Sequence, residues 1–463
     1  MKVFLVRPNS ILRATTFPLG TGYIAESARR AGHEIELLDA RLHRLTPEQV
    51  KNRVRAFRPD VIGVSAIHFE KKGAVDLAGR LQEATDVPIV VGGPLVSTSG
   101  REMVESNLVT GAIYGEGERA FNAFLEEKES GKDYSRVPGL IYRENGEVRE
   151  NPPGDYITDI DDVVPAWDLI DPPQYFRTFG RSTLNMLRRS ARSVSVFTSR
   201  GCPFGCIYCH NTFGKKFRAR SPDAVLEEIK RLRHDYDIRE LEIVDDAFNV
   251  NLDRAKEIAE RLAREVPGLH ISFSNGLRAD RMDRELIDLL RRAGVYRINY
   301  AVESASPRIQ KLIKKNLDLD KTREVISYTA EKNIFCLGYF MLGFPTETED
   351  EMRATMEYGL NSDLHAAGIF YVTPFPGTEL ARAYPPPEDR VPALDKVDYT
   401  KMEFNMSPVS EEIVKHISHR FYREFHFSPR RMWRTFRVVP KNFRTLWSVA
   451  VVGVLSFRDF GNF

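Results

Sequence analysis

Short apolar runs alternate with amphipathic stretches along the first third of the chain. Each apolar run is long enough for one strand, and the stretches between the runs carry signals that start or end helices. Strands alternating with helices are typical of a doubly wound α/β fold with a parallel sheet. The expected strands cover residues 3–6, 35–38, 61–65, 89–91 and 112–114, and the expected helices cover 20–31, 47–57, 71–84 and 117–127.

Glycine-containing loops follow several of these strands, at residues 17–22, 92–94 and 115–118. Parallel sheets bind ligands at the carboxyl ends of their strands. Glycine lets the backbone approach a ligand closely and adopt positive φ. Each loop could equally be a simple turn, but together they indicate a ligand-binding edge.

The alternation is lost between residues 136 and 190. Asn145-Gly146 lies between two extended runs, 140–143 and 147–150, which predicts a small hairpin. Proline-rich stretches on its C-terminal side suggest a segment that runs over a surface. We therefore expect a Rossmann-like first domain at residues 1–135, followed by a linker with a hairpin at 136–190.

A second series of strands and helices begins near residue 191. Its six βα units exceed one half of a doubly wound sheet, so a partial (β/α)6 TIM barrel is expected over residues 191–385, with a mainly helical segment at 386–463. Chemistry in such barrels takes place at the carboxyl ends of the strands. The expected strands are 194–198, 240–244, 270–274, 297–302, 334–342 and 367–372, and the expected helices are 222–235, 253–265, 283–293, 306–314, 320–332 and 347–360.

Composition and charge exclude several classes of protein. The chain has 67 Lys and Arg against 65 Asp and Glu, so no whole-chain field attracts it to nucleic acid or to lipid. Four cysteines in 463 residues exclude a disulfide framework. The apolar run at 3–6 is too short for a signal peptide, and no run reaches the length of a membrane span. A reducing cytoplasm is the expected location.

Three of the four cysteines, Cys202, Cys206 and Cys209, lie in a C-x3-C-x2-C motif just after the first expected barrel strand. Three thiolates on one loop can bind three corners of a cubane iron–sulfur cluster and leave the fourth iron open. The alternative is a zinc site with His210 as fourth ligand. The fourth cysteine, Cys336, lies within an apolar strand and is expected in the core.

The motif, preceded by Arg200-Gly201 and with Tyr208 at its aromatic position, resembles the signature of the radical S-adenosylmethionine (radical SAM) enzymes. The resemblance implies a [4Fe-4S] cluster that binds SAM at its open iron and cleaves it to a 5′-deoxyadenosyl radical. Tyr208 would lie beside the adenine.

Other barrel residues extend this resemblance. Asp245 and Asp246 end the second strand, where the family holds the amino group of SAM, although a helix N-cap is the alternative. Glu303, in a segment similar to the family's G-I-E-S element, would contact SAM. Asn275 and Arg297 are expected to face the same region if the strand phases hold, and the alternative is that they are solvated residues at strand ends. Gly343-Phe344-Pro345 and residues 374–378 match two further loops of the family.

A doubly wound domain before such a barrel resembles the cobalamin-binding subgroup of the family, over residues 1 to about 385. The usual D-x-H-x-x-G motif for a lower cobalt ligand is absent; His68 could ligate or shield the cobalt, or be a surface histidine. The residues expected to contact cobalamin are Leu19, Gly20, Thr21, Ser65, His68, Gly92, Gly93, Gly115, Glu116 and Gly117.

This subgroup implies a C-methyltransferase that methylates an unactivated carbon through methylcobalamin and a 5′-deoxyadenosyl radical, using SAM twice. A cobalamin-dependent cyclase or rearrangement enzyme is the alternative, and a zinc-stabilised binding protein is a hypothesis from another class. The expected partners are a small-molecule, lipid or peptide substrate and an electron donor such as flavodoxin or ferredoxin, without nucleic acid.

The C-terminal residues 411–463 contain 10 Lys and Arg and 4 Asp and Glu, a local charge of +6. Aromatic residues are interleaved with these basic ones, and an apolar stretch at 445–457 is too short to span a bilayer. The segment could pack over the barrel, or it could lie on an anionic membrane surface.

Overall fold

The computed structural model describes residues 1–10, 16–131, 133–178, 187–210, 212–386, 402 and 404–441. The chain divides into two compact units. The first comprises residues 1–177 and the second continues from residue 178, apart from a short segment at 212–214 that groups with the first. Each unit has its own sheet and its own core.

The first unit is built on a seven-stranded sheet in the order β2-β1-β3-β4-β5-β6-β7. The first five strands are parallel, and β6 and β7 continue the sheet antiparallel beyond β5. The chain order reverses between β1 and β3, which creates the crevice where such sheets bind ligands. The strands are β1 (Lys2–Arg7), β2 (Glu34–Asp39), β3 (Val61–Ser65), β4 (Ile89–Gly92), β5 (Gly111–Ile113), β6 (Leu140–Glu144) and β7 (Glu147–Glu150).

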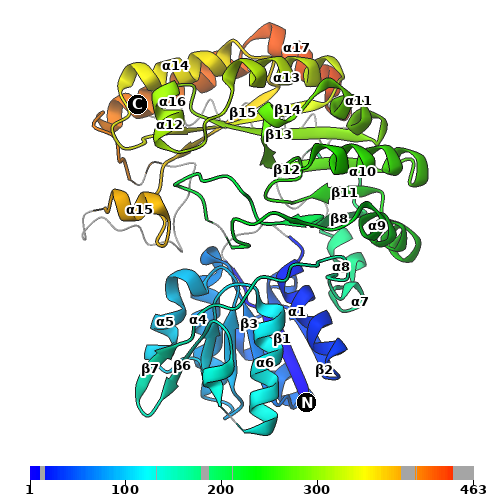
Figure 1. Cartoon of the computed structure of the whole chain (residues 1–463), viewed down its shortest axis with the longest axis vertical. Helices are drawn as coiled ribbons and strands as arrows, with labels where there is room; N and C mark the ends of the chain where they lie inside the picture. Colours follow the sequence, from blue (N-terminus) through cyan, green and yellow to red (C-terminus); the bar gives the residue numbers. More distant parts are fainter. Residues whose placement is uncertain are drawn as a thin grey trace. The chain divides into compact units, whose positions relative to one another are not determined.

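Helices cover both faces of this sheet (Figure 1). Successive residues of β1 alternate between the two cores, with Val3 and Leu5 on the α1 and α6 side and Phe4 and Val6 on the other. A strand that is buried on both faces reads as a continuous apolar run, which is why it was predictable. The helices are α1 (Leu19–Arg30), α2 (Ala40–His43), α3 (Pro47–Phe57), α4 (Lys71–Gln82), α5 (Val96–Glu105), α6 (Gly117–Ser130), α7 (Trp167–Ile170) and α8 (Pro172–Phe176), with 3-10 turns η1 (His68–Glu70) and η2 (Tyr134–Arg136).

Helix α5 was not predicted, whereas the hairpin was. The α5 sequence contains Ser97, Thr98, Ser99 and Gly100, which are poor helix formers, and its helical state depends on packing of its apolar side. The predicted hairpin is confirmed as β6 and β7. It extends the sheet at β5, so residues 136–177 belong to the first compact unit.

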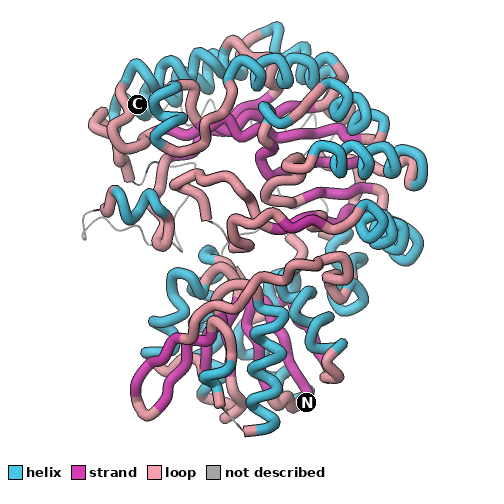
Figure 2. The backbone as a smooth tube through the Cα atoms, in the orientation of Figure 1, coloured by secondary structure: helices cyan, strands magenta, loops and turns pink. Residues whose placement is uncertain are grey.

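The second unit holds six parallel strands in the order β15-β14-β13-β12-β11-β8 (Figure 2). Over the described residues the edge strands β8 and β15 do not pair with each other, so the predicted partial barrel is confirmed. The strands are β8 (Ser193–Val196), β11 (Glu240–Ile243), β12 (His270–Leu277), β13 (Val295–Glu303), β14 (Phe335–Leu342) and β15 (Ala366–Tyr371), with a separate ribbon of β9 (Ser199–Arg200) and β10 (Arg218–Ala219).

Helices follow the strands of the second unit and lie along the outer side of its sheet (Figure 1). All six helices from α9 to α14 begin at a Ser, Thr, Asn or Asp whose side chain accepts a hydrogen bond from a backbone N–H of the first turn. The helices are α9 (Pro222–Tyr236), α10 (Leu252–Glu265), α11 (Arg284–Arg292), α12 (Pro307–Leu312), α13 (Leu319–Glu331) and α14 (Glu349–Leu360), followed by α15 (Glu379–Ala383), with a 3-10 turn η4 (Ala279–Arg281).

Two helices, α16 (Glu411–His426) and α17 (Pro429–Val438), form the described part of the C-terminal segment. Helix α16 buries Val414, Ile417, Phe421 and Phe425 and packs on α14 and β15. The apolar stretch at 445–457 lies outside the described residues. Among the described helices, none is long and apolar enough to cross a membrane.

Candidate active site

The cysteine motif lies on a loop between β9 and β10, at the carboxyl side of β8. The β9–β10 ribbon closes the base of the loop. Its middle is fixed by Ile207, whose N–H donates to the Ile313 carbonyl at 3.1 Å and whose carbonyl accepts from the Leu380 N–H at 2.8 Å. The Ile207 side chain is buried in a small apolar cluster with Ile309, Ile313, Phe344, Val372 and Leu380.

The three thiols of this loop interact electrostatically. Burial, together with the neighbouring Cys206 and Cys202, raises the pKa of Cys209 to about 12, and burial raises that of Cys202. Thiols that oppose each other's ionisation in this way ionise together only beside positive charge, which iron supplies. Three such thiols within eight residues therefore fit a cationic metal centre, for which an iron–sulfur cluster is one candidate. Cys336, in contrast, is fully buried within β14, as predicted.

The zinc interpretation required His210 as a fourth ligand. The His210 ring instead packs edge-on against Phe375, with centroids 4.6 Å apart, and burial lowers its pKa. In the part of the chain that the structure describes, no three His, Cys, Asp or Glu side chains, the three thiols included, converge as ligands of one ion. A cubane cluster does not require such convergence, because each thiolate binds a different iron.

The adjacent carboxylates Asp245 and Asp246 have different surroundings. Asp245 is buried and accepts three hydrogen bonds of 2.6 Å, from the Thr198 N–H, the Thr198 hydroxyl and the Ser199 hydroxyl. It thereby ties the end of β11 to the strand that leads into the cysteine loop. Asp246 reaches solvent on one side, but burial on the other sides and the Asp245 carboxylate raise its pKa to about 6.

Glu303 ends β13 and pairs with a buried lysine that the sequence did not single out. Lys315 Nζ lies 3.1 Å from Glu303 Oε1 and 3.4 Å from Tyr208 Oη, and the Tyr208 hydroxyl donates to the same Glu303 oxygen at 3.2 Å. Burial and the Glu303 carboxylate raise the pKa of Tyr208. Lysines in loops are mostly exposed, so Lys315 gave no signal in the sequence.

Glu303 also adopts a backbone conformation that is unusual for a residue with a side chain. Its φ is +66°, in the left-handed region. A non-glycine residue held there costs on the order of 1 kcal/mol, and such positions cluster at functional sites. The turn directs the Glu303 carboxylate toward Tyr208 and Lys315.

The predicted Gly343-Phe344-Pro345 loop is held by a second carboxylate that sequence reasoning missed. Glu347 Oε2 accepts the N–H groups of Gly343 and Phe344 at 2.9 and 3.0 Å, whereas Oε1 has no hydrogen-bond partner. Glu347 is fully buried, and this burial raises its pKa to about 8. The loop in turn sets Phe344, whose ring lies 6.0 Å from that of Tyr208.

Asn275 and Arg297 start from different heights of the sheet. Asn275 Nδ2 donates to the Val244 carbonyl at 2.7 Å, at the carboxyl side of the sheet. Arg297 is the third residue of β13 and donates to Asn299 Oδ1 at 3.0 Å, while Asn299 Nδ2 donates to the carbonyl of Ser274, the residue before Asn275. At about 3.3 Å per residue, the Arg297 backbone lies roughly 20 Å before Glu303 along β13. The expectation that its side chain faces the same region stays a prediction.

In the first unit, the predicted cobalamin residues lie at the carboxyl ends of β1, β3, β4 and β5. A Cβ added to Gly20 would lie 4.0 Å from Ser65 Oγ, which places these two residues side by side. Gly93 has a φ of +85°, and a Cβ there would lie 2.7 Å from the Ala66 carbonyl oxygen. At Gly92 and Gly115 an added Cβ would meet open space within 4 Å. The edge therefore exposes backbone, which fits a large ligand approaching the main chain.

The other predicted cobalamin residues are fixed in the fold in different ways. Leu19 and Thr21 are buried at the start of α1. Glu116 Oε2 accepts the Ile157 N–H at 2.9 Å. Gly117 is the first residue of α6, and a Cβ there would contact Ile24.

His68 follows β3 as the first residue of η1, and its Nδ1 lies 3.0 Å from Thr98 Oγ1. A buried network fixes this turn. Glu70 Oε1 accepts from Arg7 Nε at 2.8 Å and from Arg41 Nη1 at 3.0 Å, while Glu70 Oε2 accepts the Ile67 N–H at 3.0 Å. The position of His68 is thus set by charged groups that the sequence did not single out.

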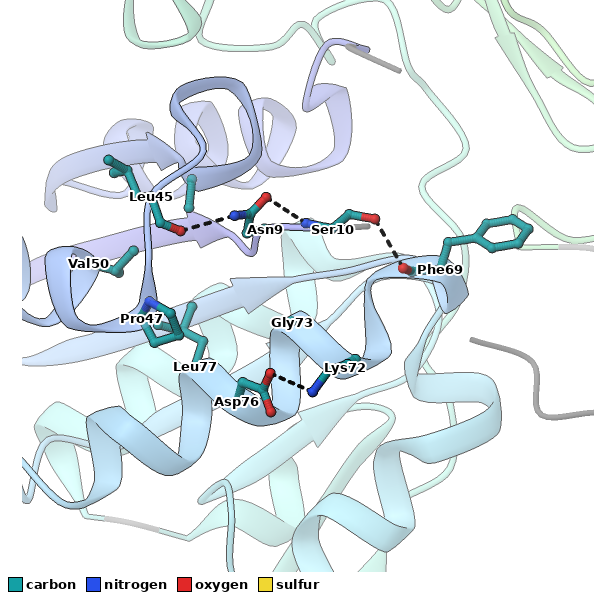
Figure 3. Close-up of a pocket in the computed structure, with 11 residues that line it drawn as sticks. Asn9, Ser10, Leu45, Pro47, Val50, Phe69, Lys72, Gly73, Asp76 and Leu77 are labelled. Atoms are coloured by element: carbon teal, nitrogen blue, oxygen red, sulfur yellow. Dashed lines mark hydrogen bonds and ion pairs between the residues drawn. The ribbon is translucent and has the colours of Figure 1, made fainter. Parts of the chain in front are cut away.

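A cavity of about 380 Å³ opens in the first unit where α4 begins, beside the segment after β1 (Figure 3). Asn9 Nδ2 donates to the Leu45 carbonyl at 3.2 Å, and the Ser10 hydroxyl donates to the Phe69 carbonyl at 3.1 Å. Both side chains are therefore hydrogen-bonded to the backbone of other residues that line the cavity. None of the described residues lining the cavity is among those predicted to contact cobalamin.

Two protein-family models match the chain. Residues 12–125 match the B12 binding domain, and residues 196–359 match the Radical SAM superfamily. The first match covers the glycine edge and the second covers the cysteine loop and most of the barrel. The predicted cofactors, a [4Fe-4S] cluster, SAM and cobalamin, are confirmed.

Three curated relatives share most of the chain. An uncharacterized methyltransferase of Pyrococcus horikoshii is 31% identical over 82% of each chain. The cytidylyl-2-hydroxyethylphosphonate methyltransferase of Streptomyces wedmorensis is 27% identical over 93% of this chain and 92% of its own. The anaerobic magnesium-protoporphyrin IX monomethyl ester cyclase of Synechocystis sp. is 26% identical over 77% of this chain and 70% of its own.

Among solved structures, the radical S-adenosylmethionine methyltransferase TsrM from Kitasatospora setae, with cobalamin and a [4Fe-4S] cluster bound, matches with a TM-score of 0.69. The match covers 83% of this chain and 77% of TsrM at 21% sequence identity. It shows that the order of a doubly wound domain, a radical SAM barrel and a helical end is a shared fold.

Proposed function

Because this chain belongs to the cobalamin-dependent radical SAM family of methyltransferase-like enzymes, we propose that it methylates an unactivated carbon of a small-molecule, lipid or peptide substrate. The observation that carries the proposal is that one chain combines a three-thiol loop at the mouth of a barrel with a backbone-lined edge on a doubly wound sheet. When bound, the cofactors would supply a methyl group carried on cobalt and a 5′-deoxyadenosyl radical.

We propose that Cys202, Cys206 and Cys209 hold the cluster. The hydrogen bonds of Asp245 to Thr198 and Ser199 position the strand that enters the loop. The backbone bonds of Ile207 fix the middle of the loop. Three sulfurs and no fourth cysteine nearby in the sequence would leave one iron for SAM.

SAM would be oriented by groups that surround this loop. Tyr208 offers an aromatic face for the adenine, and Glu303 and Asp246 offer carboxylates for the positively charged amino group. The ion pair with Lys315 holds the Glu303 carboxylate in place before SAM arrives. The Gly343-Phe344 loop supports the far side of the Tyr208 ring.

Cobalamin would be held in the first unit by the residues at the carboxyl ends of its strands. Gly92, Gly93 and Gly115 would let the corrin or its nucleotide tail approach the backbone. Ser65 would supply a hydroxyl beside Gly20. His68 lies on the turn that follows β3, where an imidazole can ligate or shield the lower side of the cobalt.

The reaction needs a one-electron donor, and we propose a flavodoxin or ferredoxin for this role. The cytoplasm stays the proposed location, because thiolates that ligate iron must remain reduced. Peripheral membrane contact of the C-terminal segment is also part of the proposal.

The test is anaerobic reconstitution with iron, sulfide and cobalamin, followed by incubation with SAM labelled in its methyl group and an extract of the source cell. Methylation predicts S-adenosylhomocysteine and 5′-deoxyadenosine in equal amounts, with label in one new product besides the methionine that SAM cleavage releases. Label confined to SAM, cobalamin and methionine, while 5′-deoxyadenosine accumulates without S-adenosylhomocysteine, would contradict it.

That second outcome would instead support the cyclase or rearrangement alternative. The similarity to the Synechocystis cyclase favours this alternative as second candidate. Both reactions share the cofactors, so the two products of SAM, rather than cofactor binding, distinguish them.

A further inference from the structure

Helix α17 has two faces of different character. In an α-helix, residues three and four apart share a side. Arg431, Thr435 and Val438 lie on one side of α17, and Met432, Trp433 and Phe436 lie on the other. The first group is in contact with the barrel and the second is in contact with solvent.

The barrel side is firmly attached. Arg431 donates to the carbonyls of Leu360 and Leu364, and its guanidinium lies 3.6 Å from the centroid of the Phe425 ring. The Thr435 hydroxyl donates to the His365 carbonyl at 3.1 Å. Val438 packs in an apolar cluster with Phe335. The helix therefore does not need its other face for folding.

The solvent side exposes large apolar groups. Trp433 is 65% exposed, Met432 55% and Phe436 41%. The Trp433 and Phe436 rings stack on each other with centroids 6.1 Å apart. Scattered apolar residues on a surface are ordinary, but three large ones on one side of one helix mark an interaction site.

Basic side chains flank this apolar face. Residues 425–441 contain four arginines and one lysine, and no Asp or Glu. Arg430 and Arg437 are exposed beside the apolar side chains, and Lys441 Nζ lies 5.2 Å from the centroid of the Phe436 ring. Asp363, which pairs with Arg434 of the same helix, is an acidic neighbour on its barrel side. A face of aromatic and apolar groups flanked by the exposed cations Arg430, Arg437 and Lys441 complements an anionic membrane surface, where aromatic rings enter the interface and cations contact headgroups.

We propose that α17 is a peripheral membrane anchor, with Met432, Trp433 and Phe436 entering the headgroup region of an anionic bilayer and Arg430, Arg437 and Lys441 contacting its phosphates. This assignment does not depend on the reaction that the enzyme catalyses. From the sequence, barrel packing and membrane contact are alternatives. In this assignment α17 does both, because one side packs on the barrel and the other side is exposed for contact with lipid.

The test is co-sedimentation of the full reconstituted chain with vesicles. One set is made of phosphatidylcholine mixed with phosphatidylglycerol, and the other of phosphatidylcholine alone. We expect binding to the mixed vesicles, weakened by added salt. Replacing Trp433 and Phe436 together by Ser is expected to weaken it at least about thirtyfold.

A second variant separates charge from apolar contact. The pair Arg430→Gln and Arg437→Gln is expected to weaken binding to the mixed vesicles by about thirtyfold and to change binding to neutral vesicles little. The matched controls are Ile413→Ser, an apolar residue 37% exposed on α16, and the pair Arg231→Gln and Arg264→Gln, exposed on α9 and α10. These controls are expected to bind like the unmodified chain.

Three outcomes would overturn the proposal. Equal binding of all variants would show that another surface contacts lipid. Absence of vesicle binding, with a dimer that Trp433→Ser and Phe436→Ser dissociate in sedimentation, would show that the face pairs two copies of the chain. Absence of binding, with a Tm lowered by those two changes in a monomer, would show that the chain covers its own face.

Discussion

Around the cysteine loop, charged side chains hold one another in buried contacts, whereas the glycine edge of the first unit presents mainly backbone. Lys315, Glu303 and Tyr208 contact each other within 3.4 Å, and Asp245 accepts three short bonds. At Gly92 and Gly115 the corresponding feature is the space where a side chain would be. The site at the cysteine loop is formed by side-chain functional groups, and the glycine edge is formed by backbone at positions that lack a side chain.

This difference predicts different responses to substitution. Removing a side chain near the cysteine loop leaves a partner buried without its hydrogen bond or counter-charge, which is costly. Removing a side chain at the glycine edge removes little. Adding one fills open space at Gly92 or Gly115, and at Gly93 it displaces the Ala66 backbone that forms the edge. Of the four tests below, three remove or replace side chains around the cysteine loop, and one adds a side chain at the glycine edge.

The largest effect is expected from replacing Cys202, Cys206 and Cys209 together by Ala. The protein should lose its cluster iron and form no detectable 5′-deoxyadenosine, while still binding cobalamin, because the first unit has its own core. Iron and cobalt contents after anaerobic reconstitution measure both effects. Cys336→Ala is the matched control and should keep its iron, since this thiol is buried in β14. Cluster iron in the triple variant would contradict the assignment.

Lys315→Met is expected to have the next largest effect. It leaves the Glu303 carboxylate buried without its cation, at a cost of about 3 kcal/mol in the free energy of unfolding. SAM binding, followed by equilibrium dialysis, should weaken in parallel. The control is Lys314→Met, since Lys314 is half-exposed and pairs with Glu379 at the surface, where an ion pair contributes less than about 1 kcal/mol. If both variants behave alike, the buried pair has no special role.

Gly93→Ala tests the glycine edge. Both Gly93 and Gly146 have a φ of +85°, so alanine imposes the same backbone strain of about 1 kcal/mol at either position. Only at Gly93 would the new Cβ meet the Ala66 carbonyl oxygen, whereas at Gly146, in the β6–β7 turn, it meets nothing within 4 Å. We expect at least about tenfold weaker cobalamin binding for Gly93→Ala alone, by spectroscopic titration, with unchanged iron content. Equal affinities in the two variants would remove Gly93 from the site.

Glu347 provides the effect that is smallest per pH unit, a change in the free energy of unfolding that accumulates over the pH range. Its pKa is raised from 4.5 to about 8 in the folded chain, so the folded state holds the proton more tightly than the unfolded state. The stabilisation is fully present below pH 4.5 and is lost as the pH rises through 8. Between these values the chain should lose about 1 kcal/mol per pH unit relative to Glu347→Gln, which cannot ionise.

Denaturant unfolding of both proteins across this pH range measures the loss. Glu349→Gln, at a half-exposed position on the same helix, should show no such divergence from the unmodified chain. Parallel stability profiles for the chain and Glu347→Gln would mean that Glu347 is ionised in the folded protein.

The fold was predictable wherever local sequence decides it. Strand β3 and helix α3 have the predicted bounds, because both faces of the sheet are buried and because Thr46 and Pro47 start the helix. Helix α5 was not, since its serines, threonine and glycine favour other conformations until the sheet is present. The strand that contains Arg297 was predicted two residues late at its start and one residue short at its end, because a period-2 pattern does not mark where a strand begins or ends.

The cysteine motif of the site was predictable from the sequence, whereas the side chains that hold the motif and its neighbours in place were not. The cysteines lie within eight residues, so their chemistry is visible in the sequence. Lys315 lies 107 residues from Tyr208, and Asp245 lies 47 residues from Thr198. Contacts at such separations depend on how the strands assemble. The assignment of Asp245 and Asp246 to SAM stays a prediction, and the structure adds that Asp245 already positions the cysteine loop.

The most direct measurement of the central claim is electron–nuclear double resonance on the reduced, reconstituted protein with SAM isotopically labelled in its amino and carboxylate groups. Three thiolates that leave one iron open predict hyperfine coupling of both labels to the cluster. An unchanged cluster signal with no coupling to either label, in protein that binds SAM, would contradict the claim.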